Sequence, residues 1–194
     1  MKITVVTPTI FRPTLRRAVE EVGQLLLPGD EHIVVRDAAR DAADLDLYKN
    51  LPVNEYTKYF EAYVPFSSFG NAQRDLAIHM AAGDCIVFLD DDDLPHPDAY
   101  KVIHELEPDP NVTHVFKMYR EYDRLTFEGG VHKIGGFGGP MLVAPRRPDL
   151  PKWYNSNNYV SDFLWGTALK NLPGMRFENH EEFICIVPTP STGK

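Results

Sequence analysis

Hydrophobic and polar positions in the first two thirds of the chain alternate between two patterns. Apolar residues recur every three or four positions from Leu15 to Leu26, as on one face of an amphipathic helix. Short apolar runs rich in β-branched residues predict buried strands at residues 3–6, 33–35, 61–66 and 85–89. Buried strands that alternate with helices predict an α/β fold, with a mostly parallel sheet flanked by helices on both faces.

Turn and capping residues set the expected bounds of the helices. Pro13 can open the first helix, and residues 28–30 (Pro-Gly-Asp) end it. A second helix is predicted from Ser67 or Ser68 to Ala82, with Gly83 closing it, and a third over residues 96–106.

The last third of the chain is richer in Gly, Pro, Asn and aromatic residues. It has no internal repeat and no obvious linker, so we expect one domain over residues 1–194. The predicted elements there are strands near 113–119, 125–133, 141–144 and 183–187 and a helix at 161–171. Residues 37–50 are expected to form a loop with a short helix.

Polar residues follow three of the predicted strands. They occupy residues 7–9 (Thr-Pro-Thr), 36–37 (Arg-Asp) and 90–93 (four Asp). Ligands in open α/β sheets bind outside the carboxyl ends of the strands, so these segments should meet on one rim of the sheet.

Composition narrows the classes of partner. The chain has 20 Lys and Arg against 28 Asp and Glu, a formal net charge of −8. This balance argues against broad binding to nucleic acids or anionic membranes, so a bound anion must be held locally or through a metal. Cys85 and Cys185 each lie in an apolar run, which predicts that both are free thiols buried in the core. No segment approaches the ~20 apolar residues of a membrane span, and we expect a cytoplasmic protein.

The four aspartates Asp90–Asp93 are the sharpest local feature. They follow the apolar run 86–89 and precede Leu94, which holds them near the sheet edge. Adjacent like charges repel, and oxygen-rich sites suit Mg²⁺ and Mn²⁺, so the run predicts a divalent-metal site. A solvated acidic face is the alternative.

Other phosphate-binding motifs are missing from the sequence. No Gly-x-x-x-x-Gly-Lys-Ser/Thr loop is present, and residues 191–194 (Ser-Thr-Gly-Lys) have no helix after them. Nor does a Gly-x-Gly-x-x-Gly segment follow the first strand. P-loop hydrolases and Rossmann dehydrogenases are therefore disfavoured.

Four motifs, in the same order, resemble the family 2 glycosyltransferases, which have the GT-A fold. They are Val5–Thr9 with Arg12, Val34–Asp37, Gly70 with Arg74 four residues later, and the segment 81–93 (Ala-Ala-Gly-Asp-Cys-Ile-Val-Phe-Leu-Asp-Asp-Asp-Asp). The resemblance covers residues 3–100. It departs after Asp37, where the family's Ser or Gly is replaced by Ala38-Ala39.

The resemblance implies a donor site and a metal site. The metal, Mn²⁺ or Mg²⁺, would lie on Asp92 and Asp90, with His180 as a further ligand. A lone surface histidine is the alternative for His180, and a surface ion pair of Arg74 with Asp75 or Asp84 is the alternative for Arg74. The implied nucleotide-binding residues are Thr7, Pro8, Arg12, Asp37, Gly70, Arg74, Asp90 and Asp91.

The family also carries an acidic pair that opens a late helix. Here Ser161 and Asp162 take that place, with Ser for the usual Glu. The resemblance implies that Asp162 is the catalytic base; stabilisation of the helix N-terminus by its charge is the alternative. Trp153, Tyr154 and Trp165 could stack on a sugar or pack in the core.

The expected function is that of a metal-dependent inverting glycosyltransferase that uses a nucleotide-diphosphate sugar, with UDP the expected nucleotide. Residues 1–110 would form the nucleotide-sugar half and residues 111–194 the acceptor and catalytic-base half. The alternatives are a nucleotidyltransferase and a sugar-nucleotide-binding module without activity. The acceptor (glycan, lipid-linked sugar, protein or modified base) and the oligomeric state, a homodimer included, stay open.

Overall fold

The computed structural model describes residues 1–10, 12–37, 46, 49–62, 69–128, 134, 136, 138–153 and 160–190. The strands are β1 (Ile3–Thr9), β2 (Glu31–Arg36), β3 (Thr57–Glu61), β4 (Cys85–Phe88), β5 (Leu94–Pro95), β6 (Val112–Arg120), β7 (Leu125–Phe127), β8 (Leu142–Pro145) and β9 (Arg176–Val187). The helices are α1 (Leu15–Leu25), α3 (Asn71–Met80), α4 (Ala99–His104), α5 (Ser161–Lys170) and a 3₁₀ turn at Gly139–Met141.

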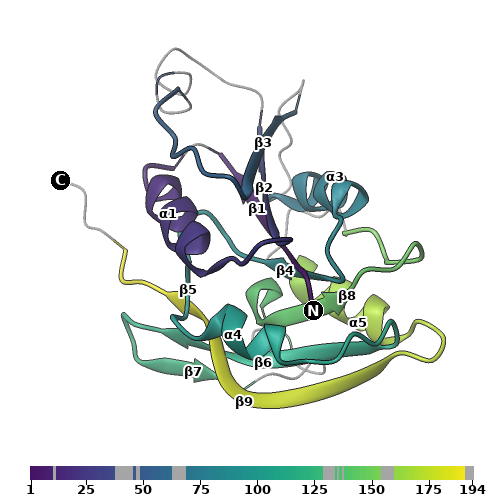
Figure 1. The fold of residues 1–194 in the computed structure, drawn as a ribbon. Coiled ribbons are helices and arrows are strands. Elements are labelled where there is room, and N and C mark those ends of the chain that lie inside the picture. The colour runs from purple at the N-terminus through teal and green to yellow at the C-terminus, as the bar shows by residue number, and fades with distance from the viewer. Residues whose placement is uncertain are drawn as a thin grey trace.

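These strands form one mixed sheet in the order β3-β2-β1-β4-β8-β6-β9-β5, with β7 beside β6 (Figure 1). The longer ladders, β1 with β2 and β4, β2 with β3, and β6 with β9, are parallel. The antiparallel ladders join only two or three residue pairs each. The prediction of a mostly parallel sheet is therefore confirmed.

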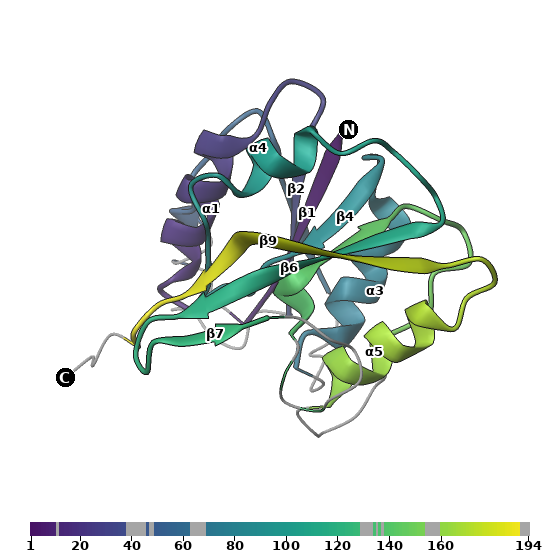
Figure 2. The ribbon, with the colours of Figure 1, turned by 90° about the horizontal axis from the view of Figure 1, so that it is seen from below.

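Helices cover both faces of the sheet. On one face, α1 and α4 contribute Val22, Tyr100 and Ile103 to a core with β1, β4 and β6. On the other face, Ala77 of α3 and Trp165 of α5 pack against β2 and β4 (Figure 2). All seven residues of β1 and all six of β2 are buried, as expected of central parallel strands.

Several predicted elements have different bounds in the structure. β3 ends at Glu61 rather than beginning there, because its pairing with β2 starts at Thr57. Residues 63–66 of the predicted range lie outside the described residues. The helix expected from Ser67 or Ser68 is α3, which begins at Asn71 after Gly70.

β9 begins at Arg176, seven residues before the predicted 183. The apolar pattern does not reveal its first half, because that half is polar and largely exposed. Several expectations lie outside the described residues: most of the short helix within 37–50, the caps Ser67 and Ser68, residues 129–133 of the predicted strand 125–133, and Tyr154. In the described residues, no helix is both long and apolar enough to cross a lipid bilayer.

Candidate active site

A cavity of about 270 Å³ opens at the carboxyl ends of β1 and β4, beside the start of α3. This is the rim where the sequence predicted that polar strand ends would meet. Six of the eight predicted nucleotide-binding residues line the cavity. The lining residues are Pro8, Thr9, Ile10, Arg12, Phe69, Gly70, Gln73, Arg74, Asp90 and Asp91.

Asp91 ties the acidic run to the segment after β1. Its carboxylate accepts hydrogen bonds from Thr9 Oγ1 at 2.6 Å, from the Ile10 backbone N–H at 3.3 Å and from Arg12 Nη1 at 2.8 Å. Asp91 is only 3% exposed, and burial raises its pKa although Thr9 and Arg12 oppose the shift. Asp91 therefore holds Thr9, Ile10 and Arg12, which line one part of the cavity, in place against the end of β4.

Two arginines supply the cations that the acidic run needs. Arg12 Nη1 lies 2.8 Å from Asp91 Oδ1 and 2.7 Å from Asp92 Oδ2. Arg74, which is 4% exposed, forms an ion pair with Asp90 rather than with Asp75 or Asp84. These pairs offset the repulsion between neighbouring carboxylates.

The fourth aspartate faces the protein interior. Asp93 is 6% exposed and accepts a hydrogen bond from Cys185 Sγ at 3.8 Å. Burial raises its pKa well above the ordinary value, and the neighbouring aspartates raise it further. With Asp91 and Asp93 both buried, the run is not simply a solvated face.

The ring of Trp153 packs against the guanidinium group of Arg74. The guanidinium carbon of Arg74 lies 4.8 Å from the Trp153 ring centroid. Trp153 is stacked on Trp165 with the ring centroids 4.9 Å apart, and both rings meet Phe88 edge to face. The two tryptophans are buried, so the core-packing interpretation holds for them, and their packing fixes the Arg74 side chain.

Gly70 has a backbone conformation that other residues rarely adopt. Its φ is +80°, and an added Cβ would lie 2.7 Å from Pro8 Cβ. Gly174 has a similar φ of +76°, but the nearest atom to its added Cβ is Asn111 Oδ1 at 3.6 Å. Substitution by Ala should strain the backbone at both positions, but it should cause a steric clash only at Gly70. Comparison of the two variants therefore separates the two effects.

We predict that Gly70→Ala lowers the free energy of unfolding by about 2–4 kcal/mol, against about 1–2 kcal/mol for Gly174→Ala. Urea unfolding measures both values. Only Gly70→Ala should also weaken nucleotide binding, because Pro8 and Arg74 must move. Equal losses in the two variants would show that the Pro8 contact does not constrain the site.

Asp162 opens α5 and lies close to the cavity. Its Oδ2 accepts the Gly139 backbone N–H at 3.0 Å. Burial raises its pKa, with Arg74 opposing and Asp90 adding to the shift, so the charges of Asp162, Arg74 and Asp90 interact. Ser161, at the position of the family's Glu, accepts a hydrogen bond from Asn71 Nδ2 at 2.9 Å.

Thr7 and Asp37 are predicted nucleotide contacts that do not line the cavity. Thr7 is fully buried, and its Oγ1 lies 2.9 Å from His32 Nε2. Asp37 is 8% exposed and accepts a hydrogen bond from Gln73, which does line the cavity. Gln73 thus lies between Asp37 and the cavity.

The Thr7–His32 pair predicts a pH-dependent stability. Burial lowers the pKa of His32 to about 3. In the unfolded chain the imidazole of His32 binds a proton below pH ~6.5, whereas in the folded chain it stays neutral until a much lower pH. The free energy of unfolding therefore falls as the pH drops below ~6.5. From pH 7 to pH 5, His32 should cost about 2 kcal/mol in the free energy of unfolding.

Urea unfolding at pH 7 and pH 5 tests this prediction. His32→Gln can still bond Thr7 but does not titrate, so the difference between the two pH values should shrink by about 2 kcal/mol. An unchanged difference in the variant would contradict the assignment to His32.

His180 does not join the acidic run. Its Nε2 lies 2.9 Å from Nδ1 of His114, which also lies 3.8 Å from Glu178 Oε2. His114 borders a recess with Met1, Asp84 and Cys85 at the amino ends of β1 and β4. Asp90 lies at the opposite, carboxyl end of β4. The predicted metal set of Asp90, Asp92 and His180 is therefore not assembled in this structure.

Sequence reasoning did not single out several residues of the cavity. Gln73 lies inside the Gly70–Arg74 motif and could have been found there. Ile10 and Phe69, which are 41% and 50% exposed, carry no motif. Large apolar side chains exposed at a cavity mouth are visible only once the fold is known.

Comparison with known proteins agrees with this architecture. No curated protein is significantly similar to the chain in sequence. The crystal structure of residues 1–349 of Staphylococcus aureus TarS superposes with a TM-score of 0.72 at 16% identity, over 98% of this chain and 61% of that one. A second TarS structure, in complex with UDP-GlcNAc, gives 0.72 at 16% identity, over 100% and 60%.

The mannosyltransferase PcManGT from Pyrobaculum calidifontis, in complex with GDP-Man and Mn²⁺, superposes with a TM-score of 0.71 at 19% identity, over 99% of this chain and 58% of that one. The chain thus spans about three fifths of the length of these structures, which support the GT-A fold. The family model described as glycosyl transferase family 2 matches residues 4–169, most of the 194 residues. The chain therefore belongs to glycosyl transferase family 2.

Proposed function

We propose that this protein is an inverting glycosyltransferase that moves a sugar from a nucleotide-diphosphate sugar, with UDP as the first candidate nucleotide, to an acceptor hydroxyl. The observation that carries the proposal is the convergence of Arg12, Arg74 and Asp90 on one cavity, with the charge of Asp162 coupled to Arg74 and Asp90. Family membership and the ligands of the TarS and PcManGT structures support it.

The cavity has features suited to a nucleotide diphosphate. Arg12 and Arg74 both line the cavity and provide positive charge for phosphate oxygens. Ile10 and Phe69 offer exposed apolar surface for a flat base. We propose that residues 1–110 hold the donor, and that residues 111–194, which contain Asp162, face the acceptor.

The residues present fit a divalent cation. Asp92 and Asp90 offer only oxygen ligands, and their side chains are 48% and 36% exposed, unlike the buried Asp91 and Asp93. A bound Mn²⁺ or Mg²⁺ would neutralise charge on the diphosphate leaving group. Asp92 is the principal proposed ligand and Asp90 the second.

Asp162 is the proposed general base. Its raised pKa makes its ionised form a stronger proton acceptor than that of an ordinary aspartate. It takes the proton of the acceptor hydroxyl as that oxygen bonds to the anomeric carbon. The bond from this carbon to the diphosphate oxygen breaks, and the electron pair leaves with the diphosphate. One displacement inverts the anomeric centre.

The two alternatives have weaker support. A nucleotidyltransferase normally has a Gly-rich basic loop after its first strand, and residues 7–12 contain no Gly. A module without activity would not need a buried carboxylate such as Asp162, whose charge interacts with those of Arg74 and Asp90.

Incubation of the protein with UDP-GlcNAc, UDP-glucose or GDP-mannose and Mn²⁺ tests the proposal, with calorimetry for binding and a coupled assay for release of UDP or GDP. We expect binding of at least one donor and slow release of its nucleotide, with water as acceptor. Absence of binding to every donor would refute the proposal. Release of pyrophosphate from UTP with a sugar phosphate would indicate the nucleotidyltransferase instead.

A further inference from the structure

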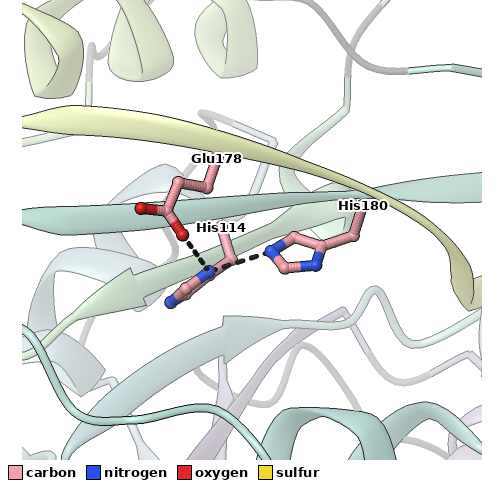
Figure 3. A group of neighbouring side chains, drawn as sticks. All are labelled: His114, Glu178 and His180. Atoms are coloured by element: carbon pink, nitrogen blue, oxygen red, sulfur yellow. Dashed lines mark hydrogen bonds and ion pairs between the residues drawn. The ribbon is translucent and has the colours of Figure 1, made fainter.

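Two histidines and a glutamate meet between the long parallel strands β6 and β9, away from the candidate active site (Figure 3). His114 lies on β6, opposite Glu178 of β9 in the register, and His180 follows two residues later. One ligand atom from each of the three lies within 4.8 Å of the other two. Within the described part of the chain, this is the sole group of three such side chains.

The distances fit a small tetrahedral ion. Two ligand atoms bound tetrahedrally to Zn²⁺ at ~2.0–2.2 Å lie ~3.4 Å apart. Nδ1 of His114 lies 2.9 Å from His180 Nε2 and 3.8 Å from Glu178 Oε2, so the two separations bracket that value. Small side-chain rotations would bring both to it.

The surroundings hold the ligands in place. His114 is 6% exposed, and the ring of His180 stacks on Phe116 with centroids 4.4 Å apart and an interplanar angle of 14°. The register between β6 and β9 shifts after Val115, at the position of His180, and such a bulge re-aims side chains. Glu178 is exposed and leaves the site open to solvent.

A metal ion can take the place of the one proton that joins the two imidazoles in a hydrogen bond. Two imidazole nitrogens 2.9 Å apart cannot both be protonated without strong repulsion. Burial, together with His180, lowers the pKa of His114, so this imidazole stays neutral and able to bind a metal. Glu178 then balances part of the charge of a bound cation.

We propose that His114, Glu178 and His180 form a second metal site, which binds Zn²⁺ and joins β9 to β6. Two His and one Glu with water in the fourth position is a ligand set that Zn²⁺ takes in proteins. The mixed nitrogen and oxygen donors set this site apart from the all-oxygen run at Asp90–Asp93, which suits Mg²⁺ and Mn²⁺.

The test uses the full chain after removal of metals with EDTA and dialysis, titrated with Zn²⁺ by calorimetry and with Co²⁺ by visible absorption. We expect one Zn²⁺ per chain, a tetrahedral Co²⁺ spectrum and, at ~100 times the Kd, a rise in Tm of about 5–11 °C. His180→Gln and the exposed Glu178→Gln should each weaken Zn²⁺ binding at least ~100-fold, since even outer-shell substitutions cost ~10–100-fold.

Two controls separate this site from others. His96→Gln removes a half-buried histidine that lies 3.9 Å from a carboxylate of Asp98 and belongs to no group of three such side chains among the described residues, and it should leave Zn²⁺ binding unchanged. Asp92→Asn should leave it unchanged as well. The proposal is overturned if Zn²⁺ binds more weakly than ~100 μM, or if Asp92→Asn abolishes binding that His180→Gln retains.

Discussion

Asp162→Asn should lower the rate of sugar transfer by about 10²–10⁴-fold, the contribution typical of a general base, while donor binding stays within about twofold of wild type. The amide cannot accept the proton of the acceptor hydroxyl. It can still accept the Gly139 N–H that Asp162 Oδ2 accepts now, so the local structure should persist. Steady-state transfer rates and calorimetry with the donor measure the two effects.

The raised pKa of Asp162 gives the same variant a second signature. Because burial disfavours the charged carboxylate in the folded state, ionisation of Asp162 costs stability. This cost is absent below the ordinary pKa, grows as pH rises between the ordinary and the raised pKa, and is fully present above the raised pKa. Asp162→Asn should therefore unfold at an equal or higher urea concentration at pH 7.

The pH dependence of the wild-type rate follows from the same shift. The base works only when ionised, so the acid limb of the rate profile should lie above the pH range of an ordinary aspartate. That limb should vanish from the residual activity of Asp162→Asn.

Asp75→Asn is a matched control for Asp162→Asn. Asp75 is also a helical aspartate whose pKa is raised by burial, and its carboxylate also accepts a backbone N–H, that of Trp153 at 2.8 Å. It does not line the cavity. Full transfer activity in Asp162→Asn, or an equal loss in Asp75→Asn, would rule out Asp162 as the base.

The central strands could be predicted from the sequence because burial on both faces leaves continuous apolar runs. β1, β2 and β4 each appear as such a run. The first half of β9 could not be predicted this way, since residues 176–182 are mostly polar and largely exposed, and residues 176–179 pair with β6. Only the tertiary pairing makes this segment a strand.

The candidate site was predictable in its residue types and less so in its pairings. The motifs placed Arg12 and Asp91 at the same rim, but not the ion pair that joins them across 79 positions. The pairing of His180 with His114 depends on the register of β9 on β6, which no local pattern encodes. The sequence placed four adjacent charges at the rim, and the fold divides them into two buried and two accessible carboxylates.

That division leads to the prediction for Asp92. Its carboxylate is 48% exposed, and among the described residues its ion-pair partner is Arg12. Asp92→Asn should weaken UDP binding in the presence of Mn²⁺ at least ~100-fold, since even outer-shell substitutions cost ~10–100-fold in metal sites. In EDTA, where UDP binding does not depend on the metal, the variant and wild type should bind UDP equally.

Asp149→Asn is the matched control, because Asp149 is 49% exposed and pairs with Arg147 at 2.7 Å, against 48% and 2.7 Å for Asp92 and Arg12. It should leave UDP binding unchanged in both buffers. If Asp92→Asn weakens binding equally with Mn²⁺ and with EDTA, Asp92 acts by holding Arg12. If it binds UDP as wild type does in both, the acidic run is not the metal site, and the charge of the diphosphate must then be met by Arg12 and Arg74 alone.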